Sequence, residues 1–262
     1  MRSGQLKASV CPPAKLSAEA RDGMWSLFSR FYVSVTREQF ESDLDKKHRV
    51  IVCRDSGDGS IQGFSTMKEF EAQIDGRTAM GIFSGDTIID PRYWGQSALQ
   101  VTFYLEVLKF KLRHFWRPVF WFLISKGFKT YLLLSRNFVE YWPRYDRPTP
   151  QWQGRVLDAF ATQLYPDAWR KELGVMKFEQ CVGALRDGVA PIDTEALAAP
   201  DIAFFLKKNP GHSQGDELAC LGKLDLPNFL GYGWKALRKA FGLSNRPRAL
   251  PADAQPQART TR

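Results

Sequence analysis

The residues best suited to chemistry lie in a turn from Pro91 to Ser97, between a predicted strand over residues 79–90 and a helix predicted from Ala98. A glycine-bearing turn of this kind points backbone N–H groups toward one spot at the positive end of the helix dipole. A phosphate or pyrophosphate group fits such a spot. The sequence therefore predicts an anion-binding turn, with an ordinary strand-to-helix connection as the alternative.

The turn resembles the acyl-CoA-binding motif of the GCN5-related N-acetyltransferase (GNAT) superfamily. In that family a Val/Ile-Asp-Pro-like segment leads into Gln/Arg-x-x-Gly-x-Gly/Ala, whose amides hold the coenzyme A pyrophosphate. Here Ile89-Asp90-Pro91 leads into Arg92-x-x-Gly95-x-Ser97, with Ser where the family has Gly or Ala. A second register, aligned on Tyr93, puts Trp94 at the Gln/Arg position. The donor-binding residues that the resemblance implies are Ile88, Ile89, Arg92, Gly95, Gln96, Ser97 and Ala98.

Acyl transfer to an amine requires that the thioester be held, its carbonyl polarised, the amine deprotonated and the departing thiolate protonated. The resemblance assigns the polarising role to backbone groups near Ile88 and Ile89. Asp86 and Asp90, at the end of the same predicted strand, are the candidate bases. The competing carboxylates on the preceding predicted strand are Glu69 and Glu71. Solvation or ion pairing is the alternative role for each of them.

The acid that the resemblance implies is a tyrosine in the helix after the strand that follows the motif. Tyr131 and Tyr141 lie on either side of that place, and Tyr145 is a weaker third candidate. Packing in the core or in a connector is the alternative for these side chains. His212, in a predicted turn, is a weaker catalytic candidate, because a loop histidine is usually solvated.

The order of predicted elements over residues 17–145 is α-α-β-β-β-α-β-α, as in the GNAT family around its binding motif. The expected fold class is α/β, a mixed and mostly antiparallel central sheet flanked by helices, with a helical C-terminal elaboration. The expected divisions are an N-terminal extension (1–16), an acyl-CoA-binding core (17–150), a part that completes the sheet with a helical insertion (151–242) and a disordered tail (243–262).

Local signals place individual elements within this order. Asp75-Gly76 predicts a hairpin, since both positions tolerate a positive φ. Gly81 and Gly85 interrupt the strand after it, which indicates a bulge or a close backbone approach. The helix predicted over 98–114 carries one apolar face, with Val101, Leu105, Leu108 and Leu112, and one polar face, with Thr102, Glu106, Lys109 and Arg113.

The composition restricts the classes of partner and site. A formal net charge of +9 favours anionic partners without choosing among them. The four cysteines lack a Cys-x-x-Cys spacing and are expected to be free thiols, which favours the cytoplasm. The three histidines are far apart in sequence, so no metal site is expected. Nucleic-acid binding is the least favoured function, because the aromatic residues occur in apolar runs rather than alternating with Lys and Arg.

A basic helix is predicted over residues 227–241, with Lys235, Arg238 and Lys239 on one face. Such a face would suit an acidic acyl carrier protein or an anionic membrane surface, and a helix packed on the core is the alternative.

The resemblance thus predicts an acyltransferase that moves an acyl group from a thioester to a small-molecule amine. The donor would be acetyl-CoA or a longer acyl-CoA, or an acyl carrier protein, without a metal. The high aromatic content, 13%, would suit an acyl chain longer than acetyl. The competing class is a non-enzymatic protein that uses the same groove to bind an acyl group, a membrane surface or a partner.

Overall fold

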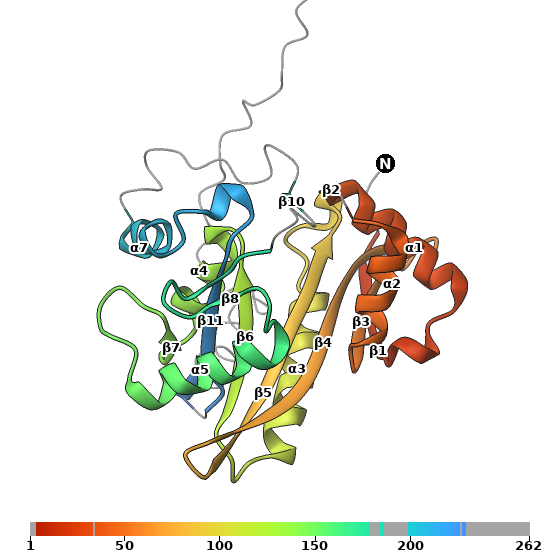
Figure 1. The fold of residues 1–262 in the computed structure, drawn as a ribbon. Helices are drawn as coiled ribbons and strands as arrows, with labels where there is room; N and C mark the ends of the chain where they lie inside the picture. The colour runs from red at the N-terminus through yellow and green to blue at the C-terminus, as the bar shows by residue number, and fades with distance from the viewer. Residues whose placement is uncertain (1–3, 34, 179–183, 186–198, 226, 229–262) are drawn as a thin grey trace, which may run out of the picture.

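The computed structural model describes residues 4–33, 35–178, 184–185, 199–225 and 227–228. Within these residues the chain forms a nine-stranded sheet, ordered β1-β3-β4-β5-β6-β11-β9-β8, with β7 also paired to β11 (Figure 1). The β5–β6 pair is parallel and the other pairs are antiparallel. The predicted fold class, α/β with a mixed and mostly antiparallel sheet flanked by helices, is confirmed.

Side-chain caps begin the first two helices. Ser17 caps helix α1 (Ala18–Phe31), its side chain accepting from the amide of Ala20 at 3.2 Å. Thr36 and Gln39 form a capping box at the start of α2 (Arg37–Asp45). Strands β3 (Arg49–Asp55), β4 (Ile61–Ile74) and β5 (Arg77–Ile89) follow. The hairpin turn between β4 and β5 holds Asp75 at φ 52° and Gly76 at φ 73°.

The N-terminal residues do more than the sequence suggests. Leu6–Cys11, which the sequence assigns to an extension, form strand β1 at the edge of the sheet, antiparallel to β3. Leu6, Ala8 and Val10 alternate with the exposed Lys7 and Ser9, which is the pattern of a half-buried strand. The local signal for this strand was therefore present in the sequence, and the expectation of an extension is corrected for these residues.

Helices cover both faces of the sheet (Figure 1). One face is covered by α1 and α2, which pack on the β3–β4 part, and by α5 (Gln151–Leu164), which packs on β6 (Val119–Ser125) and its neighbours. The other face is covered by α3 (Ala98–Arg113), α4 (Phe128–Asn137) and α7 (Pro200–Lys208). The hydrophobic core therefore lies in layers above and below the sheet.

Helix α3 packs with a different face from the one its pattern suggests. Val101, Leu105 and Leu112 are exposed by 43%, 46% and 63%, whereas Glu106 is buried. The Glu106 carboxylate is compensated by Lys109 at 2.6 Å and Arg49 at 3.5 Å. Leu99, Phe103, Val107 and Phe110 form a second apolar stripe, and this stripe packs in the core, so the periodicity alone does not decide which side faces the sheet.

The strands of the C-terminal part complete the sheet beyond β6. Strand β11 (Glu217–Lys223) lies between β6 and β9 (Val175–Met176), and β9 pairs in turn with β8 (Trp169–Arg170). Strand β7 (Tyr141–Trp142) pairs with the far end of β11, and β2 (Tyr32–Val33) pairs with β10 (Ala184–Leu185).

Several sequence predictions fall on residues that the structure does not describe. They are the basic helix over 227–241, apart from 227 and 228, and the tail over 243–262. Among the described cysteines, Cys11, Cys53 and Cys220 are free thiols. None of the described helices is both long enough and apolar enough to cross a membrane.

Candidate functional site

The two central strands separate part-way along their length. Strands β5 and β6 pair only from Met80–Phe83 to Val119–Phe122. Beyond this segment β5 pairs only with β4, and Leu123–Ser125 of β6 pair only with β11. Parallel strands that diverge in this way leave one side of each backbone without a strand partner. The sheet therefore opens between residues 84–89 and 123–126.

A bulge in β5 lies at the start of this opening. Gly85 and Asp86 together face one residue of β4, Thr66, because Ser65 pairs with Thr87 and Met67 pairs with Ser84. A Cβ on Gly85 would lie 2.4 Å from the Thr66 hydroxyl oxygen, so the close approach requires glycine. The expectation of a bulge or close approach at Gly85 is confirmed. The bulge turns the Asp86 side chain toward the face that α1 and α5 cover.

Backbone direction decides which amides of β5 can meet a ligand. The amide of Asp90 donates to the carbonyl of Gln62 on β4 at 2.8 Å. Because alternate residues of a strand point the same way, Ile88 also faces β4, whereas Thr87 and Ile89 face the opening. The carbonyl of Ile89 accepts from the Trp94 indole at 2.9 Å. Of the two residues predicted to polarise a carbonyl, Ile89 has the required direction and Ile88 does not.

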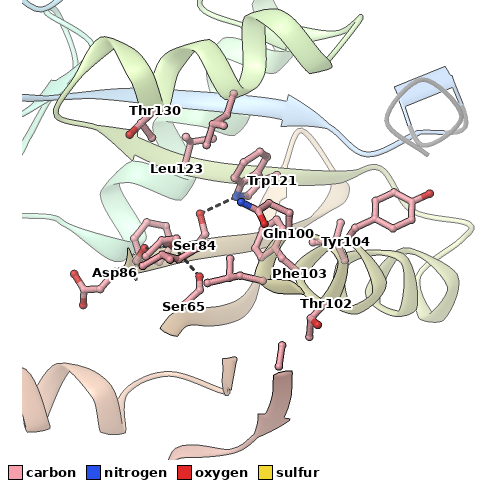
Figure 2. A pocket seen from close by; sticks show the side chains of 18 of the residues that line it. Ser65, Ser84, Asp86, Gln100, Thr102, Phe103, Tyr104, Trp121, Leu123 and Thr130 are labelled. Atoms are coloured by element: carbon pink, nitrogen blue, oxygen red, sulfur yellow. Dashed lines mark hydrogen bonds between the residues drawn. The ribbon is translucent and has the colours of Figure 1, made fainter. Parts of the chain in front are cut away.

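The opening is the base of a large cleft that passes through the sheet, with a volume of about 2120 Å³. This volume exceeds the roughly 300–1,000 Å³ of pockets for single small ligands. On one side, here called the α3 side, the cleft is lined by Gly95, Ser97, Gln100, Val101, Tyr104 and Leu133. On the other, the α1 side, it is lined by Phe28, Tyr32, Lys47, Asp86, Tyr165 and Glu217. Figure 2 shows Asp86 and Tyr104 at opposite ends of the view, with Ser84 and Trp121 between them.

The predicted anion-binding turn lies at the α3 side of the cleft. Gly95 adopts φ 91°, and a Cβ built there would meet no atom of the described residues within 4 Å. Ser97 is the N-cap of α3, but its side chain makes no capping hydrogen bond. The first amides of α3 are therefore not satisfied by a side-chain cap. Gly95, Ser97 and Ala98 thus line the cleft beside a helix N-terminus, as the motif requires.

Gln96 lines the same turn, yet its hydrogen-bonding groups are engaged elsewhere. Its side-chain oxygen accepts from the amide of Leu6 at 2.8 Å, and its side-chain nitrogen donates to the carbonyl of Gly4 at 3.1 Å. Its own amide donates to the carbonyl of Tyr93 at 3.3 Å. The predicted donor-binding role of Gln96 is therefore corrected: it fastens β1 to the turn.

Arg92 and Asp90 also differ from the sequence prediction. The Arg92 guanidinium binds both carboxylate oxygens of Asp90, at 3.0 and 3.2 Å, and Gln62 at 3.2 Å. It lies on the α1 face, beside Arg30 and Arg54, and not with Gly95. Arg30 binds the buried Asp90 as well, at 2.9 Å. The two guanidinium groups, Arg92 first, hold the pKa of Asp90 down at about 2. Asp90 is thus a structural ion-pair partner rather than a base, and Arg92 is not placed to bind a phosphate in the turn.

The two tyrosines predicted to act as the general acid also lie outside the cleft. Tyr131 is fully buried and donates to the carbonyl of Pro143 at 2.9 Å. Tyr141 is 2% exposed and packs beside it, with ring centroids 6.2 Å apart. Burial raises the pKa of both, that of Tyr141 to about 12. Since neither lines the cleft, this corrects their assignment as the acid.

The weaker candidates do not line the cleft either. Glu69 binds Arg49 at 3.3 Å and Arg113 at 2.7 Å, and Glu71 binds Arg117 at 3.0 Å. Tyr145 is 52% exposed, and His212 contacts the carbonyl of Asn209 at 3.1 Å. Solvation and ion pairing explain these residues, so Asp86 is the one predicted acid–base residue that reaches the cleft.

Asp86 lies within a group of ionisable side chains from six separate segments, which sequence reasoning did not bring together. Lys126 and Glu217 form an ion pair at 3.3 Å. The other members on this α1 side are Tyr32, Asp43, Lys47 and Tyr165. No local motif links these residues, because only the pairing of strands and the packing of helices on the sheet bring them to one place.

Burial dominates the electrostatics of this group. It raises the pKa of the Asp86 carboxyl against the lowering effect of Lys47, and it raises the pKa of Glu217 against that of Lys126. It lowers the pKa of Lys47 and raises the pKa of the Tyr32 and Tyr165 hydroxyls. A carboxylate with a raised pKa is a better proton acceptor, and a tyrosine with a raised pKa stays protonated.

Comparison with known proteins gives matches in structure alone. No family model and no curated protein sequence matches the chain. A GNAT family N-acetyltransferase from Escherichia coli, solved in complex with CoA, is 15% identical, with a TM-score of 0.33; the match covers 46% of this chain and 64% of that one. The chain is similar to GNAT-family N-acetyltransferases.

Two further structures match the chain at similarly low identity and over a similar part of its length. A probable N-acyltransferase from Enterococcus faecalis is 14% identical, with a TM-score of 0.38, covering 49% of this chain and 32% of that one. An acetyltransferase from Trypanosoma brucei is 16% identical, with a TM-score of 0.35; the match covers 56% of this chain and 98% of that one. The chain thus spans about a third of the Enterococcus protein and just under two thirds of the Escherichia protein. Each likeness covers about half of this chain, so its activity has to be inferred from its own residues.

The described residues gather no group of three or more His, Cys, Asp or Glu side chains that could hold a metal ion.

Proposed function

We propose that this chain transfers an acyl group from a thioester donor, coenzyme A or an acyl carrier protein, to an amine. The observation that carries the proposal is the parting of β5 and β6 at a bulge. It leaves outward-facing amides at Thr87 and Ile89, with Asp86 on the other side of the same strand. A thioester lying in the opening would meet amides on one side and a carboxylate on the other.

The proposed reaction uses each of these groups once. The amide of Thr87 or Ile89 donates to the thioester carbonyl oxygen, where negative charge develops in the transition state. Asp86 accepts a proton from the ammonium form of the acceptor, and the free amine attacks the carbonyl carbon. The new C–N bond forms, the amine nitrogen loses its second proton, and the C–S bond breaks. The thiolate takes up one proton, so the net products are an amide, a thiol and one proton released to solvent.

Tyr165 is the hydroxyl proposed to protonate the thiolate. Its ring packs edge-on against Phe83, with centroids 5.9 Å apart, and Phe83 is the last paired residue before the opening. This role replaces the one that the sequence assigned to Tyr131 or Tyr141.

The donor site between the turn and α4 is proposed to hold an acyl chain longer than acetyl. The α3 side of the cleft is largely apolar, with Val101, Leu105 and Leu133 each more than 40% exposed. Burying one CH₂ group contributes about 0.8 kcal/mol, so each added carbon should strengthen donor binding. Longer chains should therefore bind more tightly than acetyl until the apolar walls end.

A second candidate function is binding of an acyl group without turnover. It is favoured by the turn itself, in which Gly95 is the one glycine and Gln96 is engaged with β1. A binding protein would still hold the donor but would release no thiol in the presence of an amine.

The test is a thermal-shift series followed by a thiol-release assay. Free coenzyme A, acetyl-CoA, octanoyl-CoA, palmitoyl-CoA and an octanoyl-charged acyl carrier protein would be compared, and a ligand at a hundred times its Kd should stabilise the fold by about 2.7 kcal/mol. Amine-dependent thiol release, lost in Asp86→Asn, supports transfer. Stabilisation without thiol release for any amine supports the binding function, and no stabilisation by any of the five overturns both.

A further inference from the structure

On the α1 side of the cleft, Lys47 and Asp86 carry opposite charges, but they do not form an ion pair with each other. Lys126 and Glu217 are paired at 3.3 Å, but neither Lys47 nor Asp86 forms an ion pair within 4 Å with any residue that the structure describes. Both line the cleft, and both carry pKa shifts caused first by burial. Removing a charge from water without a partner is costly, so such groups usually meet a counter-charge.

The two charges are close enough to act on one small molecule. The Lys47 ammonium lies 3.4 Å from the position that a Cβ on Gly85 would take, and Gly85 precedes Asp86 at the bulge. The Lys47 ammonium also lies 5.5 Å from the centre of the Phe83 ring. Lys47 therefore lies over the start of the opening, with Asp86 beside it.

A molecule that satisfies both groups must carry an ammonium and a carboxylate near each other. The ammonium would face Asp86, where the proposed reaction needs the nucleophile. The carboxylate would face Lys47, whose pKa an anion would raise again. An α-amino acid has these two groups on one carbon, whereas a simple amine leaves Lys47 with only the longer-range influence of Asp43 and Asp86.

The residues around Lys47 and Asp86 indicate the kind of side chain that the acceptor carries beside its ammonium and carboxylate groups. The aromatic residues that line the α1 side are Phe28, Tyr32, Phe40, Phe83, Tyr165 and Phe178. Rings of this kind bury apolar and aromatic groups well, and the charged groups of Lys126 and Glu217 on the same side already pair with each other. The side chain of the acceptor is therefore apolar or aromatic.

We infer that the acceptor is an α-amino acid with an apolar or aromatic side chain, its carboxylate bound by Lys47 and its amine facing Asp86, so that the product is an N-acyl amino acid. This inference rests on the proposed acyl transfer and adds its acceptor. Lys47 is the residue that sets the preference for a carboxylate-bearing amine.

The experiment compares L-phenylalanine with phenethylamine, which has the same ring and amine but no carboxylate. With octanoyl-CoA as donor, the wild type should use phenylalanine with a kcat/KM about 10- to 100-fold higher, the range for a hydrogen bond to a charged group. In Lys47→Gln the ratio of the two kcat/KM values should fall toward one. Lys207→Gln is the matched control, since Lys207 is exposed on α7 and lies outside the cleft, and it should keep the wild-type ratio.

The outcomes separate this inference from the proposed function. If the wild type acylates both compounds with nearly equal kcat/KM values, the amino-acid acceptor is overturned and the proposed acyl transfer still stands. If neither is acylated, equilibrium titration of both compounds into the protein with coenzyme A present decides. Binding of phenylalanine but not phenethylamine, weakened about tenfold or more in Lys47→Gln, supports the acceptor site while acyl transfer fails. Equal binding of the two, or no binding, overturns the inference.

Discussion

The indole N–H of Trp121 on β6 donates a hydrogen bond to the hydroxyl oxygen of Ser84 on β5, at 2.9 Å. Ser84 is the first residue of β5 beyond the paired segment, so this side-chain bond continues the connection where the backbone pairing ends (Figure 2). It fixes the point from which the two strands diverge, and with it the width of the cleft at its base.

Ser84→Ala should lower both stability and donor affinity. The change leaves the indole N–H of Trp121, which is 9% exposed, without its acceptor, at a cost of about 1–3 kcal/mol. Urea unfolding measures the stability, and titration with coenzyme A measures the affinity. Ser84→Thr keeps the hydroxyl and serves as the control. A stability of Ser84→Ala equal to that of the wild type would mean that this hydrogen bond does not hold the strands together.

Asp86→Asn should reduce turnover by about 10²–10⁴-fold, the usual contribution of a general base, with little change in donor affinity. In the wild type the rate should fall as the pH drops through the raised pKa of Asp86, because the protonated carboxyl accepts no proton. This acidic limb should be missing from the pH profile of the variant. Asp167→Asn, a change at an exposed carboxylate outside the cleft, should keep the full profile. Full turnover by Asp86→Asn would remove this residue from the mechanism.

The same substitution should raise stability at neutral pH. The pKa of Asp86 is higher in the folded than in the unfolded chain, so the folded state binds more protons and stability falls as the pH rises. Asparagine does not ionise and avoids this loss. Thermal unfolding at pH 4 and pH 7 should show an advantage of the variant that grows with pH. An advantage that is constant over this range would contradict the sign of the pKa shift.

Gly95→Val should abolish donor binding while the chain still folds. Residue 95 adopts φ 91°, so valine costs backbone strain, and its side chain would occupy the approach to the turn. Gly174→Val controls for the strain, because Gly174 has φ 73° and equal free space but lies outside the cleft. Both variants should lose stability, and only Gly95→Val should lose affinity for coenzyme A. Unchanged affinity in a folded Gly95→Val protein would rule out the turn as the phosphate site.

Asp90→Asn should destabilise the fold without affecting donor affinity. The pKa of Asp90 is lowered to about 2 from 3.8, so its contribution to stability is present above pH 3.8 and is lost as the pH falls through about 2. The difference in unfolding free energy between wild type and variant should therefore shrink steadily below pH 4.

Arg92→Gln should also leave coenzyme A affinity unchanged, and a clear loss of affinity would restore the phosphate role that its sequence position suggested.

The basic residues Lys235, Arg238 and Lys239 give a prediction from sequence alone. Changing all three to Gln should weaken binding to an acidic carrier protein at low salt and flatten its dependence on ionic strength near 0.15 M, where charges are screened over roughly 8 Å. Fluorescence anisotropy with a labelled carrier at several salt concentrations measures this. Identical curves for wild type and variant would leave no docking role for these charges.

Elements with strong local signals could be predicted from the sequence, and Val119–Ser125 begins and ends where its apolar run does. The position of Asp86 in the cleft was also predictable, since the end of the central strand follows from the motif. Lys47, Tyr165 and Glu217 were not, because they reach the cleft from segments far apart in the chain. Arg92 and Tyr131 were misassigned for another reason: sequence position fixes a backbone location but not the side to which a side chain turns.

Gln96 connects the edge strand β1 to the turn at the head of α3 through both of its side-chain groups. Segments tied in this way tend to open together in local unfolding. The amide of Leu6 should therefore exchange its hydrogen for deuterium at a rate governed by the turn, in which Gln96 lies 90 residues away along the chain. A ligand that settles on the turn would slow that exchange without touching Leu6, so β1 can report on occupancy of the cleft.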